Sequence, residues 1–392
     1  MTRHPESNLI DSVTQLLSEH GLEYMSEAIR LMLNEAMKIE RSRTLAAEPY
    51  QRSPERRGYA NGFKPKTLKT RLGSITFEVP QVRGEVEFYP SALERGVRSE
   101  RALKLAIAEM YVQGVSTRKV TEVMQELCGL EVTSTEVSRA AALLDEQLAA
   151  WRTRPLGETP YLMLDARYEK VRHGGVVRSC ALLIAVGVNA DGRRSILGVS
   201  VSLSEAEVHW RDFLASLQDR GLHGVRLITS DDHAGLQAAR QARLPGVRWQ
   251  RCQFHLQQNA QAYVPRLGMR PEVAVELRTI FDAPDSADAE RRLALAVQKY
   301  DKSAPQLARW MEESIPEGLT VLGLPAAHRK RLRTTNLLER LNKEIKRRTR
   351  VATLFPNEAS LLRLASAVLM EISEEWETQG TYLRMEDNRP ET

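Results

Sequence analysis

Cysteine is scarce in this 392-residue chain, and long apolar runs are missing. Three cysteines cannot build a disulfide framework, which predicts a reducing compartment. The N-terminus reads MTRHPESNLIDSV and lacks the apolar core of a signal peptide. The longest apolar run, residues 180–188, is far shorter than the roughly 20 residues that a membrane-spanning helix needs. We therefore expect neither secretion nor a membrane partner, but a cytoplasmic location.

Lysine is also scarce, since only 12 of the 56 basic residues are lysine and 44 are arginine. The net charge of +5 and the pI near 9.1 are compatible with a polyanionic partner. Arginine binds phosphate through a planar fork, although Arg codons favoured by a GC-rich genome would give the same bias. With 42% hydrophobic and 27% charged residues, the composition is typical of a globular protein of about two to four domains.

Residues 1–98 are predicted to form an N-terminal helical region with a basic arm and short strands. Residues 8–47 show two helical apolar faces separated by Gly21. Residues 51–72 carry seven bases and one acid, with Gly, Pro and two aromatic residues. We interpret this stretch either as a loop along a phosphate backbone or as a solvated linker. A short strand pair is expected around 73–80 and 86–89.

Residues 99–155 show the pattern of a helix followed by a helix-turn-helix DNA-binding domain. Ser116 can cap one helix, and Thr133 with Glu136 can form a capping box for the next. Ser138 and Arg139 would point outward, as in a recognition helix. Helical hairpins are common, so this pattern alone does not establish DNA binding. The side chains expected to be buried are Val120, Val123, Met124, Leu127, Val137, Leu143 and Leu144.

From residue 160 the pattern becomes α/β. Strands are expected at 161–164, 176–188, 195–202, 225–229 and 247–251, with a helix at 206–220. This order predicts an α/β ribonuclease H-like catalytic core, a mixed sheet with flanking helices, preceded by the α-helical DNA-binding region. We assign its first part to 156–258, a helical insertion to 259–333, its last helices to 334–380, and a frayed acidic tail to 381–392.

Three acids are candidates for one catalytic site. Asp165 and Asp231 each end an expected strand, and Glu339 lies on a basic helix at 335–348, away from its apolar face. Together they could hold Mg²⁺, for which Mn²⁺ can substitute, because both ions prefer oxygen ligands. The alternatives are ordinary strand-end acids and a capping box between Asn336 and Glu339.

Cys252 and His255 form a C-x2-H pair just past the expected strand 247–251. Zinc would need further ligands, and the sequence contains no second tight Cys/His pair. We therefore expect no structural zinc, but a packing or hydrogen-bonding role beside the active site.

Five ordered blocks resemble the bacterial branch of the Mutator-like DDE transposases of insertion sequences. The resemblance implies that Asp165, Asp231 and Glu339 are the catalytic acids and metal ligands. Cys252 and His255 match the C-x2-H signature of that family. The blocks are YLMLDARYEKVR, LLIAVGVNADGRRSILGVSVSLSEAEVHWRDFL, LITSDDHAGLQAA, WQRCQFHLQQNA and RTTNLLERLNKEIKRRTRVATLFPNEASLLRL.

The match has one departure and one ambiguity. Gln258 stands where the family has Arg before Asn259, which removes one expected basic contact. Asp232 is an alternative to Asp231 as the second metal ligand. Successive strand residues face opposite ways, so only one of the two side chains can point toward the site. The 108 residues between Asp231 and Glu339 (339 minus 231) suit the family's helical insertion.

The resemblance implies an enzyme that binds terminal inverted repeats, cleaves transposon ends and joins the freed 3′-hydroxyls to target DNA. It further implies a copy-out, paste-in route and a homodimer on DNA at the bacterial nucleoid. The alternatives are a non-catalytic DNA-binding repressor, against which the intact acids argue, and a structure-selective nuclease. Beside the acids we expect Asn342 as an auxiliary residue, and the predicted DNA contacts are Ser138, Arg139, Lys343, Lys346, Arg347 and Arg348.

Overall fold

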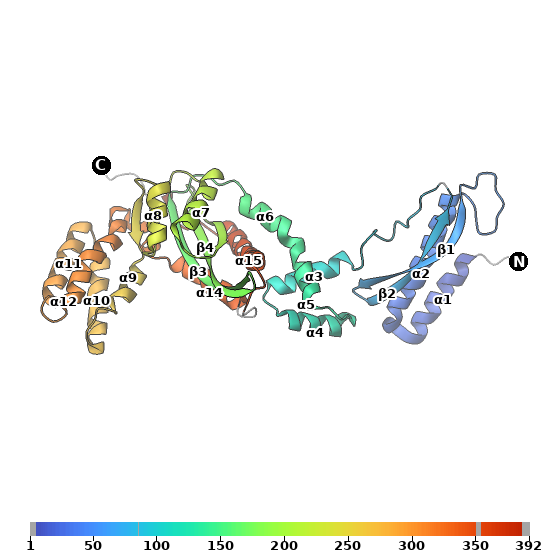
Figure 1. The fold of residues 1–392 in the computed structure, drawn as a ribbon, viewed down its shortest axis with the longest axis horizontal. Coiled ribbons are helices and arrows are strands. Elements are labelled where there is room, and N and C mark those ends of the chain that lie inside the picture. The colour runs from blue at the N-terminus through green and yellow to red at the C-terminus, as the bar shows by residue number, and fades with distance from the viewer. Residues whose placement is uncertain (1–4, 85, 350–353, 386–392) are drawn as a thin grey trace. The chain divides into compact units, whose positions relative to one another are not determined.

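The computed structural model describes residues 5–84, 86–349 and 354–385. The chain forms two compact units, Met1–Leu143 and Leu144–Thr392 (Figure 1). Across the described residues, no helix combines the length and the apolar character that crossing a bilayer requires.

The first unit begins with two helices and a β-hairpin. The positive φ of 66° at Gly21 marks the expected break between the helices. A shared core joins α2 to β2 through Met37, Ile75, Phe77 and Val79. The elements are α1 (Pro5–His20), α2 (Met25–Leu45), β1 (Tyr59–Thr70) and β2 (Gly73–Arg83), and the two strands pair antiparallel.

This hairpin corrects two sequence expectations. Much of the basic stretch 51–72 is strand β1 rather than a loop, and the partner of β2 is β1 rather than residues 86–89. β1 is exposed over most of its length, so the sequence shows no apolar alternation there. β2 buries alternate residues and is therefore recognisable.

Three helices complete the first unit, and their caps are those that the sequence predicts. Ser116 Oγ accepts a hydrogen bond from Lys119 N–H, and Thr133 and Glu136 form a reciprocal capping box. Gly129 ends the middle helix with a left-handed φ of 61°. The helices are α3 (Arg101–Val112), α4 (Thr117–Cys128) and α5 (Ser134–Ala141).

Two of the expected core residues in this helix-turn-helix lie at the surface. Val120, Met124 and Val137 are buried, but Leu127 is 74% and Leu143 50% exposed. The prediction that Leu127 and Leu143 are buried is therefore wrong. Leu127 lies in the last turn of α4, and α5 ends at Ala141, before the helical period would turn Leu143 inward.

A five-stranded mixed sheet forms the centre of the second unit, in the order β5-β4-β3-β6-β7. β3, β4 and β5 pair antiparallel, whereas β6 pairs parallel with β3 and β7 parallel with β6. Residues 189–192 make the expected turn between β4 and β5. The strands are β3 (Tyr161–His173), β4 (Val176–Val188), β5 (Arg194–Ser202), β6 (Leu227–Ser230) and β7 (Arg248–Arg251).

Strand β3 is longer than the sequence suggests, so Asp165 lies inside it and not at its end. Asp165 pairs with Ile184 of β4. The pairing of β3 with β6 ends at Met163, two residues before Asp165. The β3–β4 hairpin continues beyond the neighbouring strands, where most of its side chains are exposed. The apolar pattern therefore stops while the strand goes on.

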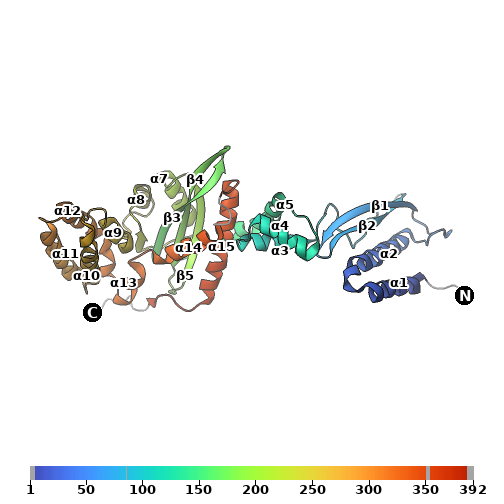
Figure 2. The same ribbon diagram turned by 90° about the horizontal axis from the view of Figure 1, so that it is seen from below.

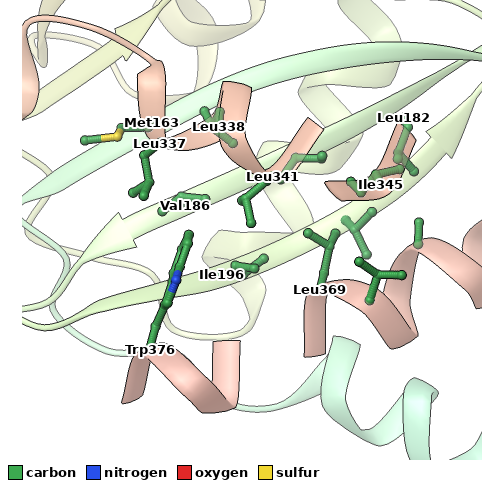
Figure 3. Close-up of a cluster of buried hydrophobic side chains, with 14 of the residues drawn as sticks. Met163, Leu182, Val186, Ile196, Leu337, Leu338, Leu341, Ile345, Leu369 and Trp376 are labelled. Carbon is green, nitrogen blue, oxygen red and sulfur yellow. The ribbon is translucent and has the colours of Figure 1, made fainter. Parts of the chain in front are cut away.

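Helices cover both faces of this sheet. One face packs against α7 (Glu207–Asp219) and α8 (Ala234–Arg243), with Trp210 in the core. Figure 3 shows the other face, where Leu341 of α14 and Leu369 of α15 pack in one cluster with strand residues such as Val186. The helices on that face are α6 (Asp145–Thr153), α14 (Asn336–Thr349) and α15 (Glu358–Thr378).

The assignment of two short segments changes. The sequence predicts α6 as part of the helix-turn-helix segment, but α6 belongs to the second unit, where Asp145 pairs with Arg363. Residues 381–385 are packed and not frayed, because Tyr382 and Leu383 donate their N–H groups to Gly192 O. The remainder of the acidic tail, 386–392, lies outside the described residues.

Between β7 and α14 the chain is mostly helical, as expected, and these helices gather beside the sheet (Figures 1 and 2). Helices α9 to α12 share a hydrophobic core of their own, which includes Leu277, Tyr300 and Met311, whereas Leu332 of α13 belongs to the core at the sheet. The helices are α9 (Gln253–Ala260), α10 (Arg270–Phe281), α11 (Ser286–Tyr300), α12 (Pro305–Ser314) and α13 (Ala326–Leu332).

Candidate active site

Asp165 projects from β3 toward α14. Side chains alternate along a strand, so Asp165 shares the face of Met163, which packs against α14. Its Oδ1 accepts from Ala166 N–H at 2.9 Å, and its Oδ2 accepts from Asn342 Nδ2 at 2.8 Å. Burial nevertheless raises the pKa of Asp165 to about 6, because a charged carboxylate is poorly solvated there.

Asp231 follows the last residue of β6, as the sequence predicts. Its Oδ1 accepts from Asp232 N–H at 2.8 Å and lies 3.9 Å from His255 Nδ1. Asp232 instead pairs with the buried Arg251, with Oδ2 and Nη1 3.0 Å apart. The two adjacent acids thus have different surroundings, and Asp231 is the one beside His255.

Glu339 lies in the first turn of α14. Its N–H donates to Thr335 O, so helical hydrogen bonding already starts at Thr335 and Asn336 is inside the helix. This geometry does not support the capping-box alternative. One turn further, Asn342 lies on the same side of the helix. The atoms Glu339 Oε1 and Asn342 Oδ1 are both buried and have no hydrogen-bond partner.

Cys252 links the ends of three elements. It follows β7, and its N–H donates to Ser230 O of β6 at 2.8 Å. Its Sγ accepts from Thr335 N–H at 3.4 Å and from Thr335 Oγ1 at 3.3 Å, just before α14. The start of α14, which carries Glu339, is therefore held against the strand end that Asp231 follows.

Cys252 and His255 favour each other's charged forms. Burial opposes ionisation of the Cys252 thiol, but hydrogen bonding with His255 and Thr335 outweighs it and lowers the pKa. The pKa of His255 is raised, first by Cys252 and then by the carboxylates of Asp231 and Asp165. A protonated imidazole thus lies between the thiol and the two acids.

A fourth acid, Glu205, lies near this site and is not predicted from the sequence. Its side chain is only 13% exposed, and it lies 3.8 Å from His233 Nδ1. Its charge contributes to the raised pKa of both Asp165 and Tyr168. Glu205 precedes α7 in a loop without a recognisable pattern, so only its nearness to His233 and Asp165 in the fold reveals it.

The site is only partly assembled for a metal ion. Among the described ranges, no three His, Cys, Asp or Glu side chains lie close enough together to form a ready ligand set. The buried, unpartnered oxygens of Glu339 and Asn342 are nevertheless acceptors that a cation would satisfy. All the side chains that converge from β3 and α14 offer oxygen, the donor that Mg²⁺ prefers.

The predicted DNA contacts differ in their exposure and in their partners. Ser138, Arg139, Lys343 and Lys346 are exposed. Arg347 is exposed but pairs with Glu344. Arg348 does not fit the prediction of a DNA contact, because its side chain is 6% exposed and pairs with Glu344 and Glu371. Buried between two carboxylates, it stabilises the packing of α14 on α15 and is unavailable to a phosphate.

Comparison with known proteins gives extended matches. The profile of a family described as "Transposase, Mutator family" matches residues 3–379. The transposase for insertion sequence element IS406 of Burkholderia multivorans is 59% identical, over 98% of this chain and 99% of that protein. The transposase for insertion sequence element IS256 in transposon Tn4001 of Staphylococcus aureus is 36% identical, over 88% and 89%.

A solved structure, a simian T-cell lymphotropic virus intasome in complex with a PP2A regulatory subunit, matches weakly. It covers 44% of this chain and 65% of its own, with 15% identity and a TM-score of 0.18. That score is too low to support an inference about the fold.

Proposed function

The chain belongs to the Mutator family of transposases, and from this premise we propose that it is a DDE transposase that cleaves and joins DNA strands. Its substrates are the terminal inverted repeats of its insertion sequence and a target DNA, on the bacterial nucleoid. The relatives are named as insertion-sequence transposases over nearly their whole length, which supports a DNA substrate.

The proposed catalytic residues are Asp165, Asp231 and Glu339, which would hold Mg²⁺ or Mn²⁺. Ions held by these carboxylates would supply activation of an attacking hydroxyl and charge stabilisation at the leaving oxygen of a phosphoryl transfer. Asn342 fixes the Asp165 carboxylate through its amide hydrogen bond. His255 stays protonated beside Asp231 and can donate a hydrogen bond to a carboxylate or a DNA phosphate.

We further propose a ribonuclease H-like core. Numbered along the chain, the strands of the sheet occur in the order 3-2-1-4-5, with helices on both faces. The first and fourth of these strands carry or precede the two aspartates. The helices α9 to α12, which have their own core, would lie in an insertion between the second and third acids.

The observation that carries this proposal is the hydrogen bond between Asn342 of α14 and Asp165 of β3, because it brings the third acid's helix to the first acid. A strand-transfer assay with Mg²⁺ and DNA carrying the insertion-sequence ends tests it. Asp165→Asn, Asp231→Asn and Glu339→Gln should each abolish cleavage and joining while DNA binding persists. An active Asp231→Asn enzyme with an inactive Asp232→Asn enzyme would transfer the second role to Asp232.

The route and the assembly are proposals as well. A copy-out, paste-in route predicts circular intermediates with abutted ends, which outward-facing amplification across the junction would detect. Because two ends must be held together, we propose a homodimer on DNA. Measuring the mass of the protein–DNA complex by light scattering tests this, and one chain on paired ends would contradict it.

A further inference from the structure

A basic cleft in the first unit offers a second type of DNA contact. The cleft has a volume of about 510 Å³ and lies between α3, α5 and the segment 96–99. Its base is apolar, with Leu103, Ile107 and Val132 buried. Its charged side chains are Lys69, Arg98, Lys104, Glu136 and Arg139. We propose that this cleft binds the phosphodiester backbone of DNA, an inference that rests on the proposed function.

Lys69, at the end of β1, joins the walls of the cleft. Its backbone N–H donates to Arg98 O at 3.0 Å, and its O accepts from Glu100 N–H at 2.8 Å. Its Nζ donates to Glu136 Oε1 of α5 at 2.9 Å and to Glu131 O at 3.0 Å. The strand, the segment before α3 and the helix α5 are thus connected through one residue, so the cleft is formed before any ligand binds.

The cleft carries an excess of positive charge. Glu136 neutralises Lys69, which leaves Arg98, Lys104 and Arg139. Within the part of the chain that the structure describes, none of these three lies in a salt bridge. Three unpaired cations around an apolar base match a phosphodiester backbone, whose phosphates are anionic and whose sugars are partly apolar.

The cleft also changes the role expected for Arg139. Arg139 lines the cleft, whereas Thr135 and Ser138 of the same helix do not. Arg139 therefore holds the backbone together with Lys104 and Arg98, and base reading is left to the exposed residues of the first turn. Arg98 and Lys104 lie outside the recognition helix, and no sequence pattern marks them as DNA contacts.

Salt-dependent binding of the full chain distinguishes these roles. The probes are a labelled duplex carrying the insertion-sequence end and a scrambled duplex of equal composition, followed by fluorescence anisotropy. The triple variant Arg98→Ala, Lys104→Ala, Arg139→Ala should flatten the plot of log K against log salt by about 0.9 per side chain, or about 3 in total. The affinity for both duplexes should fall by the same factor, so that their ratio is unchanged.

Matched variants separate charge from misfolding. Arg101→Ala, on the same helix but outside the cleft, should flatten the plot far less than Lys104→Ala. The charge-conserving Arg98→Lys, Arg139→Lys protein should keep the wild-type slope. A folded triple variant with the wild-type slope, or an Arg139→Ala protein that loses only the preference for the end duplex, would overturn the inference. Wild-type protein that binds neither duplex would instead refute the proposed function.

Discussion

Asp165 accepts two hydrogen bonds, yet burial still raises its pKa from the ordinary 3.8 to about 6. The folded protein therefore loses stability when this carboxyl ionises, by at most about 3 kcal/mol. The loss is complete above about pH 6 and disappears as the pH falls through 6 toward 4. In this fold, the ionised carboxylate of Asp165 is therefore destabilising when no cation is bound beside it.

Asp165→Asn should therefore raise the free energy of unfolding at about pH 8, by about 1–3 kcal/mol. The amide can keep the bond from Ala166, and Asn342 can turn its unpartnered Oδ1 toward the new NH₂ group. Urea unfolding in the presence of a chelator, at about pH 8 and about pH 4, measures this. The gain should shrink at the lower pH, and a variant less stable than wild type at both values would contradict the explanation.

Asn342→Ala should weaken divalent-metal binding by about 10- to 100-fold, the usual effect of losing a residue that orients a ligand. Its amide holds Asp165 and lowers the pKa of that carboxyl, so its loss should also shift the acid limb of the activity profile to higher pH. Mn²⁺ titration calorimetry gives the affinity without turnover. Asn336→Ala, an exposed asparagine at the start of the same helix, is the control and should bind Mn²⁺ normally.

An individual site residue can be predicted from the sequence where its position coincides with a local secondary-structure pattern. Asp231 at a strand end and Glu339 on the polar side of an amphipathic helix can be found from periodicity. Glu205 cannot, because its relation to Asp165 exists only once β3 and the loop before α7 are packed together. The burial of Arg348 is equally non-local, since its partner Glu371 is on another helix.

Among the secondary-structure elements, the segment that connects α13 to α14 determines where Glu339 lies. Thr335 donates both its N–H and its hydroxyl to Cys252 Sγ, and Thr229 Oγ1 donates to Leu332 O. These contacts join the start of α14 to the ends of β6 and β7. Cys252 is fully buried, so its sulfur is the acceptor for groups that water cannot reach.

Cys252→Val should lower the free energy of unfolding by about 1–3 kcal/mol, because it leaves the Thr335 donors without an acceptor. Cys252→Ser restores an acceptor of similar size and should recover most of the loss. Thermal unfolding monitored by circular dichroism compares the three proteins. Equal stability of the Val and Ser variants would mean that the sulfur is only a packing group.

A helix or strand can be predicted from the sequence when one of its faces is buried and the other is exposed to solvent. The helix at α7 is evident from Trp210, Phe213 and Leu217, and the capping box at α5 from Thr133 and Glu136. β1 has no such contrast, because it is exposed along most of its length. Its strand form depends on pairing with β2, which a single-segment pattern does not encode.

For the whole molecule, the two units have separate cores. The first contains the α2–β2 core, and the second contains three clusters around the sheet and the helices of residues 253–333. Fragments 1–143 and 144–392 should therefore each unfold cooperatively. In calorimetry of the full chain, Mg²⁺ should raise the transition temperature that matches fragment 144–392 and leave the other unchanged. A fragment without a cooperative transition would contradict this independence.

The order of the acids along the chain has a consequence during translation. Asp165 and Asp231 leave the ribosome before the helices of residues 253–333, and Glu339 follows 108 residues after Asp231 (339 minus 231). At about 5–20 residues per second, this gap lasts roughly 5–20 s. If the first unit binds DNA and Glu339 completes the catalytic site, as proposed, a nascent or prematurely terminated chain would be able to bind DNA before it could break a strand. On the proposed function, the growing polypeptide would therefore gain DNA binding before it gains catalytic activity.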